Sequence, residues 1–396
     1  MGRICIVSAF DPLPGEDRPL IRYPVLADCL SKAGHQVKYL TTNFNHFEKE
    51  IRKAHSSVGF ELFQVPVPAY RHNVGMARLW SHRRFAKGVI QMLHRFQEPP
   101  DLILSAYPPI LVNTLLGDWA REVDCLFWLD VQDDWPEAFL ARLPQLPFVR
   151  SFLGPIYDLQ KKSVQQADAI SAVSRDYFAL LERRFGKQVM PEKQFVFPLG
   201  QPTPKIAEKE LLKAAELFPD FPSRKIAVYV GTSSRIPFVE EILQYPDQVP
   251  GNLGLVLVLA HPRFEKWQGL QHPNVKVLGF QDSDSLSRIL YRADIGLMLS
   301  DPLLQTRLPN KVQLYWMHGL SVVSNLPGSE LAELIKQSAS GVTFSGDIGQ
   351  LWGACHSIDK KLATNSRSRL KKWANTQFSQ RAIYQAFAQK ISDLVG

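Results

Sequence analysis

The chain has 396 residues, of which 45% are hydrophobic and 21% are charged, and its formal net charge is +8. This composition is typical of a soluble globular protein, and the length predicts two domains of ordinary size. No apolar run reaches the length of a membrane-spanning helix, and Met1 leads directly into the strand-like segment 3–7, so we expect no signal peptide. The positive charge favours an acidic partner: nucleic acid, anionic lipid or a phosphorylated ligand.

The cysteines are scattered along the chain, at Cys5, Cys29, Cys125 and Cys355. Their spacing matches no zinc-ligand pattern, and Cys5 and Cys125 stand in apolar, strand-like segments as small core residues. We therefore expect a reduced, cytoplasmic protein without a zinc site.

Strands and helices alternate through the first half of the chain. Residues 4–8 predict a strand, residues 20–33 predict an amphipathic helix with Gly34 as its C-cap, and residues 35–40 predict a second strand. This order forms a βαβ unit and therefore an open parallel sheet. Further strands are predicted at 101–104, 125–129 and 168–174.

A change in composition separates this half from a second alternating region. Residues 198–224 contain five prolines and several charges, which predicts a crossing to a second domain. Strands are then predicted at 226–230, 255–259, 275–279 and 295–299, with a helix at 283–292. In two such doubly wound halves, ligands are expected beyond the carboxyl ends of the strands, in a cleft between the halves. The chain ends in a helix, at 383–395, whose apolar stripe predicts packing back on the protein rather than on a partner.

The segment 300–328 combines a strand end, a loop, a short helix and a second strand. Pro309 suits the first helical position, which leaves the N–H groups of Asn310 and Lys311 at a helix N-terminus. Unpaired amides, the positive end of the helix dipole and the cations Arg307 and Lys311 together make a phosphate site. The alternative is an ordinary βαβ unit with solvated charges, and the local pattern favours neither.

Basic and aromatic residues gather between positions 70 and 87, where the sequence has four arginines, one lysine, two histidines and three aromatic residues. Such a mixture can bind nucleic acid, or it can hold an enzyme to anionic lipid headgroups. The third interpretation is a surface helix with outward charges and a buried apolar stripe. Arg78 and His82 are candidates to reach a phosphate on an acceptor.

Short segments distributed along the chain carry a family resemblance. In chain order they are AGHQVKYLTTNF, DVQDDWPEAF, ADAISAVS, YVGT, VKVLGF, LYRADIGLMLS and LPNKVQLYWMHGLSVVSN. In this order they resemble the GT-B fold glycosyltransferases, most closely the retaining family 4 (group 1) enzymes of bacterial polysaccharide assembly. The resemblance covers residues 1 to about 330. It implies an α/β protein with two Rossmann-like domains: an acceptor-side domain at 1–199, joined by a C-terminal helix at about 379–396, and a donor-binding domain at 200–378.

The resemblance implies that the second domain binds a nucleotide-diphosphate sugar. The leaving diphosphate gains negative charge as its bond to the sugar breaks, and preorganised cations and amides stabilise that charge. The resemblance assigns the diphosphate to a pair of cations, for which Lys311 and Arg235 are the candidates. The other expected donor-binding residues are Gly231, Thr232, Gly279, Phe280, Pro309, Asn310 and Glu330.

One position departs from the family pattern. Relatives usually have a glutamate three residues after the lysine, where it would bind the ribose, but this chain has Leu314 there and Thr306 eight residues earlier. Leucine cannot accept a hydrogen bond from a hydroxyl group. Ribose binding is therefore expected from Glu330 or Glu333, unless donor binding is altered or activity is lost.

Carboxylates follow a predicted strand on the acceptor side. A carboxylate at Asp133 or Asp134 can orient or deprotonate the attacking hydroxyl, and Asp133 aligns with the family's aspartate before the tryptophan. The alternative for Asp133 is a loop or helix-capping carboxylate. Gly15 and Arg18 follow the first strand and are expected to face the diphosphate.

The sequence thus predicts a glycosyltransferase that moves a sugar from a nucleotide sugar to a glycan or a polyprenyl-diphosphate-linked acceptor in cell-surface polysaccharide synthesis. Asp282 and Asp284 are interpreted as helix-capping residues, so no metal or other cofactor is expected. The expected location is the cytoplasm, peripheral at the inner face of the plasma membrane. The alternative is a non-catalytic GT-B relative that binds a nucleotide or glycan as a scaffold or regulator; a nucleic-acid partner is disfavoured, because two nucleotide-domain patterns fill the chain.

Overall fold

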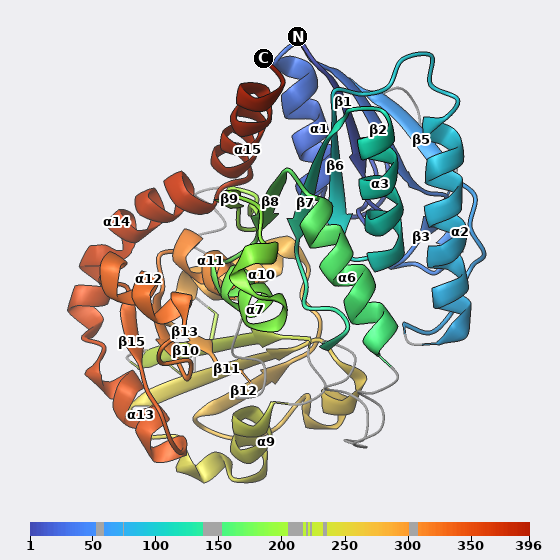
Figure 1. Cartoon of the computed structure of the whole chain (residues 1–396). Coiled ribbons are helices and arrows are strands. Elements are labelled where there is room, and N and C mark those ends of the chain that lie inside the picture. The colour runs from blue at the N-terminus through green and yellow to red at the C-terminus, as the bar shows by residue number, and fades with distance from the viewer. Residues whose placement is uncertain are drawn as a thin grey trace. The chain divides into compact units, whose positions relative to one another are not determined.

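The chain folds into two compact units. The structure, a computed structural model, describes residues 1–52, 59–73, 75–137, 153–204, 217–218, 221, 224–232, 236–300 and 308–396. One unit comprises Met1–Gly200 together with Gln380–Gly396, and the other comprises Gln201–Ser379. Each unit contains a parallel β-sheet with helices packed on it, as the alternation of strands and helices predicts (Figure 1).

The first unit contains a seven-stranded sheet in the order β5-β2-β1-β6-β7-β8-β9, whose neighbouring strands are parallel. Its strands are β1 (Arg3–Val7), β2 (Gln36–Thr42), β5 (Glu61–Val65), β6 (Leu102–Tyr107), β7 (Leu126–Val131), β8 (Ala169–Ala172) and β9 (Lys193–Val196). A small antiparallel pair, β3 (Phe44–Asn45) and β4 (Glu50–Ile51), follows β2. The helices of this unit are α1 (Arg22–Lys32), α2 (Met76–Leu93), α3 (Ile110–Glu122), α6 (Gly154–Gln166), α7 (Asp176–Phe185) and α15 (Gln380–Val395).

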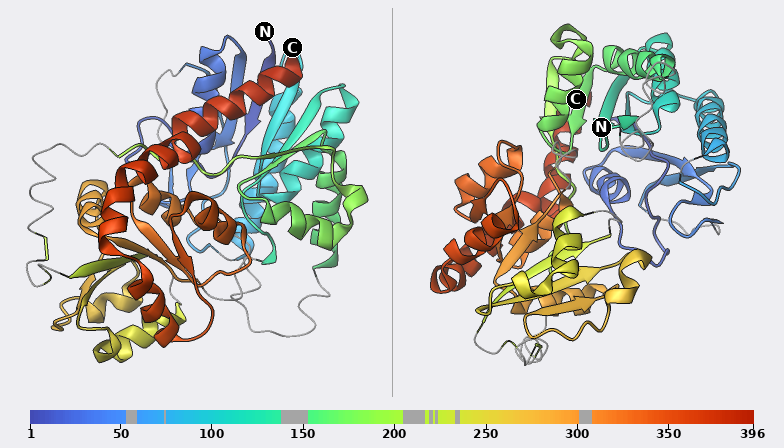
Figure 2. Two further views of the ribbon diagram at one scale, coloured as in Figure 1. Left: turned by 90° about the vertical axis from the view of Figure 1, so that its left-hand side faces the viewer. Right: turned by 90° about the horizontal axis from the view of Figure 1, so that it is seen from below.

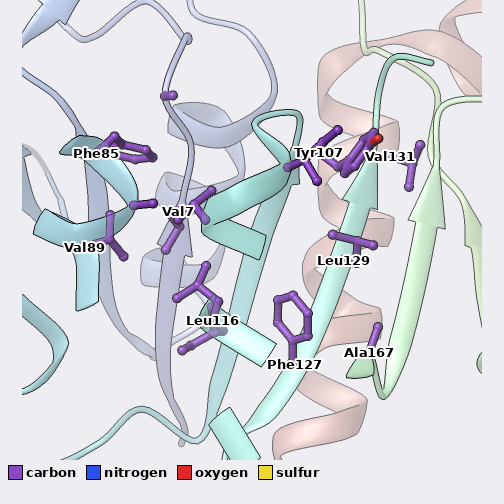
Figure 3. Packing of buried hydrophobic residues seen from close by; sticks show 14 of the residues in the cluster. Val7, Phe85, Val89, Tyr107, Leu116, Phe127, Leu129, Val131 and Ala167 are labelled. Atoms are coloured by element: carbon purple, nitrogen blue, oxygen red, sulfur yellow. The ribbon is translucent and has the colours of Figure 1, made fainter. Parts of the chain in front are cut away.

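Two apolar layers hold this sheet between its helices, because successive side chains of a strand point to opposite faces. Ile4 and Ile6 of β1 join the layer that includes α1 and α15, whereas Cys5 and Val7 join the layer that includes α2, α3, α6 and α7. Figure 3 shows part of the second layer, in which Phe85 of α2 lies near Val7. Both faces of the central strands are therefore buried, which explains their nearly unbroken apolar sequence.

The C-terminal helix α15 completes the first unit. It lies beside α1 and buries Ile383, Phe387 and Ile391 against the sheet, so the prediction that this helix packs back on the protein is confirmed (Figure 2). Below it, the fully buried guanidinium of Arg22 forms an ion pair with Asp130, at 2.5 Å between Nε and Oδ2. Burial alone would lower the pKa of Arg22, but the Asp130 carboxylate more than offsets this effect, so the arginine stays charged.

The second unit contains a six-stranded sheet in the order β12-β11-β10-β13-β14-β15, also parallel. Its strands are β10 (Lys225–Gly231), β11 (Leu253–Leu259), β12 (Val275–Leu278), β13 (Ile295–Met298), β14 (Ser321–Ser324) and β15 (Gly341–Thr343). Its helices are α9 (Pro237–Gln244), α10 (Ser283–Arg292), α11 (Asn310–Met317), α12 (Glu330–Ser338), α13 (Ile348–Ser357) and α14 (Lys360–Phe378). Asp282 caps α10 by accepting a hydrogen bond from the Ser285 N–H at 2.8 Å, as predicted, and Asp284 lies in the first turn of that helix.

Candidate functional site

The predicted donor residues of the second unit follow its strands at one edge of the sheet. Gly231 and Thr232 stand at the end of β10, and Gly279 and Phe280 directly follow β12. Pro309, Asn310 and Lys311 open α11 between β13 and β14, and Glu330 opens α12 after β14. Because the carboxyl ends of parallel strands meet at the same edge, the sheet brings these segments to one side. The predicted cation Arg235 lies outside the described residues, and so do Thr306 and Arg307 of the segment before α11.

Lys311 is a desolvated cation in the first turn of α11. Its Nζ lies 4.2 Å from the centre of the Tyr229 ring and donates a hydrogen bond to Tyr229 Oη at 3.0 Å. Burial lowers the pKa of Lys311 to about 8. Among the described residues, the structure pairs this ammonium with no carboxylate. Among the described residues the cation is therefore held by the ring and the hydroxyl group of Tyr229, at a helix N-terminus, where an anion would be stabilised.

The position of Lys311 is fixed by Tyr315, one helical turn further along α11. Tyr315 Oη accepts a hydrogen bond from the Val230 N–H at 2.9 Å and donates one to the Leu297 carbonyl at 3.3 Å. These bonds attach α11 to both β10 and β13. A side chain at Gly296 would overlap the Tyr315 ring, since an added Cβ would lie 2.3 Å from it. The glycine of ADIGLMLS thus lets the helix approach the sheet.

Gly231 has a similar steric role at the end of β10. A Cβ added there would lie 2.5 Å from Tyr229 Oη, the atom to which Lys311 donates. Glycine at this position therefore leaves room for the Tyr229 side chain to lie beside Lys311. The YVGT segment therefore supplies two parts of this site: the Tyr229 ring that contacts Lys311, and Gly231, whose missing side chain leaves room for that ring.

The predicted place of Pro309 in the helix is wrong by one residue. Pro309 has an extended backbone, with φ −73° and ψ 130°, and it is the N-cap of α11, so Asn310 is the first helical residue. The reason lies in the next turn, where the Pro309 carbonyl already accepts a hydrogen bond from the Val312 N–H at 3.0 Å. The first-turn amides still open toward the carboxyl edge of the sheet, as the phosphate interpretation requires.

The remaining donor-side residues are arranged less closely. Phe280 is exposed after β12, and an added Cβ on Gly279 would lie 2.7 Å from Gln268 Nε2. Glu330 is the first residue of α12, after the N-cap Ser329. Leu314, at the position of the expected ribose-binding glutamate, packs against the apolar cluster behind α11. Among the residues that the structure describes, no contact joins Gly279 or Phe280 to Lys311.

Arg78 organises the corresponding edge of the first unit. Its guanidinium lies over three aromatic rings, at 4.8 Å from the Trp135 centroid, 5.3 Å from Phe10 and 5.8 Å from Tyr70. Nε donates to His82 Nε2 at 3.3 Å, and Nη1 donates to the Asn73 carbonyl at 2.6 Å. The structure thus brings together Arg78 and His82, which the sequence predicted, with aromatic residues that it did not.

Asp133 interacts electrostatically with Arg78. Burial lowers the pKa of Arg78, and the Asp133 carboxylate is one of the groups that oppose this lowering. Asp133 follows β7 as predicted, and its Oδ1 accepts a hydrogen bond from the Asp134 N–H at 3.0 Å. Trp135 is fixed two residues later, because its carbonyl accepts a hydrogen bond from Tyr107 Oη at 2.7 Å. The loop after β7 therefore presents a half-buried carboxylate beside an arginine and an aromatic wall.

Two histidines in the cluster are neutral near physiological pH. Burial, supported by the charge of Arg78, lowers the pKa of His82 to about 3. Burial, with Lys49 and Arg78, lowers the pKa of His46 to about 4. His46 Nδ1 lies 2.6 Å from Tyr70 Oη, so one ring nitrogen is already engaged. Neutral imidazoles in these positions serve as hydrogen-bonding groups rather than as charges.

Two predicted acceptor-side residues have structural partners in the first unit. Asp134 forms an ion pair with Arg184 at 2.9 Å, which ties the loop after β7 to α7. Gly15 adopts φ 91°, a conformation that favours glycine, in the loop after β1. Arg18 in the same loop pairs with Glu48 at 2.8 Å and lies 4.6 Å from the Phe47 centroid.

Sequence reasoning assigned no site role to Phe10, His46, Trp135 or Tyr229, and it counted Tyr70 only among the aromatic residues of segment 70–87. Trp135 and Tyr229 stand in segments that carry the family resemblance, so their motifs could have signalled them. Phe10 and His46 come from two separate loops and show no common spacing in the sequence, whereas Tyr70 opens the basic and aromatic segment 70–87.

Comparisons with known proteins identify the fold. Residues 24–200 match the family described as a glycosyl transferase 4-like domain, which lies within the first unit. The sucrose-phosphate synthase of Thermosynechococcus elongatus superposes with a TM-score of 0.69 at 15% identity, over 100% of this chain and 99% of that one. WaaG, a glycosyltransferase involved in lipopolysaccharide biosynthesis, gives 0.66 at 14% identity, over 98% and 99%. No curated protein sequence matches.

A third structure shows a ligand in the same fold. HepE of Anabaena, in complex with UDP-glucose, superposes with a TM-score of 0.64 at 14% identity, over 99% of this chain and 100% of that one. The three structural matches each span both units of the chain. The chain therefore has the GT-B glycosyltransferase fold that its motifs predict, and its segment 24–200 matches the model of the glycosyl transferase 4-like domain.

Proposed function

We propose that the chain is a glycosyltransferase that moves a sugar from a nucleotide-diphosphate sugar to a glycan or lipid-linked acceptor in cell-surface polysaccharide synthesis. The observation that carries the proposal is Lys311, a desolvated cation at the N-terminus of α11, with an aromatic ring but no carboxylate among its described neighbours. Burying a charge without a counterion costs free energy, and a bound diphosphate would supply the missing anion. The proposed location is the inner face of the plasma membrane.

In this proposal the second unit stabilises the leaving group. As the bond between the sugar and the diphosphate breaks, negative charge grows on the phosphate oxygens. Lys311 and the first-turn amides of α11 are positioned to stabilise that charge without reorganising. No metal is needed for this step in the proposal, and retention of the anomeric configuration rests on the family resemblance.

The first unit would bind the acceptor. Asp133 would orient or deprotonate the attacking hydroxyl, and the rings of Trp135 and Phe10 would form apolar walls beside it. His46 and His82, which are neutral, would offer hydrogen bonds to an acceptor without repelling Arg78. Asp134 is held by Arg184, so its role in this proposal is to position the loop.

Leu314 favours a second candidate function, a GT-B relative that binds a nucleotide or glycan without transferring it. Its side chain packs into an apolar cluster, so it offers nothing to a ribose. In that case the diphosphate site around Lys311 would persist while turnover is absent.

Calorimetric titration of the whole chain with UDP, ADP, GDP and dTDP tests the diphosphate site. We expect one of these nucleotides to bind, and we expect Lys311→Ala to weaken it by about 100-fold, because a charge-assisted contact to phosphate is lost. Lys336→Ala is the control, since Lys336 is exposed in the last turn of α12, at the opposite end of that helix from Glu330. If no nucleotide binds at millimolar concentration, or if both variants bind equally, the donor assignment is wrong.

Release of nucleotide diphosphate from the matching nucleotide sugar then separates the two functions. Asp133→Asn should lower turnover by about 100-fold or more and leave nucleotide affinity unchanged. Asp158→Asn, in an exposed position on α6, is the control. Full turnover by Asp133→Asn would reject Asp133 as the base, and binding without any turnover would favour the non-catalytic function.

A further inference from the structure

Helix α2 has two faces of opposite character. Its buried face comprises Arg78, Ser81, His82, Phe85, Ala86, Val89 and Leu93. At 100° per residue these positions fall on one side of the helix, and Met76, Leu79, Trp80, Arg83, Arg84 and Lys87 fall on the other. All six of the latter residues are exposed. We call them the outer face of α2.

The outer face begins with large apolar side chains. Met76 is 78% exposed, Leu79 is 56% exposed and Trp80 is 53% exposed. Exposed apolar residues are ordinary when they stand singly, but three within the first two turns of one helix form a patch. The other described large hydrophobic side chains that are exposed are Met1, Phe47, Ile51, Tyr245 and Phe280, and only Met1 and Phe280 are more exposed than all three residues of the patch.

The following turns of the outer face are basic. Arg83, Arg84 and Lys87 are exposed. The sequence contains no aspartate or glutamate between Glu61 and Glu98, so no acidic residue of α2 offsets these charges. The surface of an anionic bilayer offers acyl chains to exposed apolar side chains and phosphates to the cations beside them.

We propose that the outer face of α2 docks on an anionic lipid bilayer. Met76, Leu79 and Trp80 enter the boundary between headgroups and acyl chains, while Arg83, Arg84 and Lys87 bind lipid phosphates. Within the described chain no helix has the length and hydropathy to cross a bilayer, so this contact is peripheral.

The same two turns of α2 connect the bilayer to the acceptor cluster. Arg78 and His82 lie on the buried face of these turns, beside Trp135 and Phe10. Docking through Leu79 and Trp80 therefore holds the acceptor cluster at the headgroup level, where the sugar of a lipid-linked acceptor stands. This last step rests on the proposed function, but the binding to lipid does not.

Charge and shape disfavour the other occupants of this face. A second copy of the chain would bring Arg83, Arg84 and Lys87 of both copies near one another, and like charges repel. A nucleic acid would satisfy the basic residues but would leave Met76 and Leu79 without an apolar partner, and only Trp80 could stack on a base. An anionic bilayer satisfies both halves of the face.

Flotation of the whole chain with vesicles tests the proposal. We expect binding to phosphatidylcholine vesicles that contain 30% phosphatidylglycerol, about tenfold weaker binding at high salt, and little binding to phosphatidylcholine alone. The triple variant Arg83→Glu/Arg84→Glu/Lys87→Glu should weaken binding by about 100-fold. The matched control, Arg183→Glu/Lys187→Glu/Lys193→Glu, reverses three exposed charges between α7 and β9 of the same unit and should weaken binding far less.

A label measures insertion directly. Leu79→Cys, made in a Cys29→Ser background because the other three cysteines are buried, can carry an environment-sensitive nitrobenzoxadiazole group. We expect a blue shift on anionic vesicles and quenching by lipids brominated along the acyl chain, whereas a label at Lys187→Cys should show neither.

Several outcomes would overturn the proposal. These are no binding at low salt by folded protein, equal loss in both charge-reversal variants, or a label at position 79 that stays in water. The same holds if Leu79→Ser/Trp80→Ser converts a dimer to a monomer, or if a single-stranded RNA binds more tightly than vesicles and depends on the same residues. Nucleotide titration is independent of lipid, so failure of vesicle binding with intact nucleotide binding rejects the docking surface alone.

Discussion

Each unit holds a desolvated cation at the carboxyl edge of its sheet, but the two cations are surrounded differently. Arg78 in the first unit contacts three aromatic rings, a histidine and a backbone carbonyl, and it interacts electrostatically with the Asp133 carboxylate. Lys311 in the second unit has one ring and one hydroxyl group, both from Tyr229. Burial lowers the pKa of both cations, and for Lys311 burial is the cause that is resolved.

The difference separates two uses of a buried charge. The contacts of Arg78 fix the loops that carry Phe10, Tyr70 and Trp135, so the arginine serves as a structural centre for its site. Lys311 contacts only Tyr229 among the described residues and joins no loops together. Helix α11, in which Lys311 lies, is attached to the sheet by the hydrogen bonds of Tyr315 instead. A charge that costs folding free energy without organising its surroundings is expected to be kept for a ligand. Replacing each cation by an uncharged side chain of similar length should therefore have opposite effects.

Arg78→Met should destabilise the chain by about 2–3 kcal/mol. The loss comprises the cation–π contacts with three rings and the hydrogen bond to the Asn73 carbonyl. Urea unfolding followed by circular dichroism measures the change, with Arg83→Met on the exposed face of the same helix as the control. An unchanged unfolding midpoint for Arg78→Met would remove the contrast with Lys311.

Lys311→Met should stabilise the ligand-free chain by about 1–2 kcal/mol at pH 7. The folded state lowers the pKa of this lysine from 10.5 to about 8, which means that folding penalises the charged form. The penalty is fully present below pH 8 and is relieved as the pH rises from about 8 toward 10.5, so the advantage of the variant should fade over that interval. Thermal unfolding at pH 7 and pH 10 measures both values, and a lower melting temperature for the variant at pH 7 would contradict the prediction.

The affinity for a nucleoside diphosphate should fall by up to about tenfold between pH 7 and pH 9. Over this interval the diphosphate keeps its charge, while Lys311, whose pKa is lowered to about 8 by burial, loses its proton. Isothermal titration at both pH values measures the change. Lys311→Arg is a useful control, because its side chain stays charged and should bind with little pH dependence. An equal fall for both proteins would assign the effect to another group.

Local patterns in the sequence predicted most of the fold. The strands at β1, β7, β10 and β13 are buried on both faces, so their apolar runs stand out from their surroundings. Asp282 marked the start of α10 through its capping chemistry, and Gly34, predicted as the C-cap of α1, is the residue after the C-cap Ala33, where φ is 92°. The place of Pro309 was wrong by one residue, because proline suits both the N-cap and the first helical position, and only the backbone angles decide.

The acceptor cluster could not be predicted to the same degree. An arginine in a basic segment is expected at the surface, yet Arg78 is buried, because loops that follow three different strands place aromatic rings around it. Tyr229 was hidden for a different reason, since an aromatic residue in an apolar strand is expected in the core. The side chains that surround each cation depend on which strands become neighbours, and the order of the strands is a property of the whole sheet.

The two connections between the units lie side by side, as the short contacts around Gly200 show. The Gly200 N–H donates to Tyr384 Oη at 3.1 Å, and an added Cβ would lie 2.7 Å from the Gln380 Cα. The second unit is therefore an uninterrupted insertion in the first, which needs α15 to cover the apolar face of its sheet. During synthesis on the ribosome, Gln201–Ser379 can complete its own core before α15 emerges, whereas the first unit waits with that face open. The N-terminal unit begins first and finishes last.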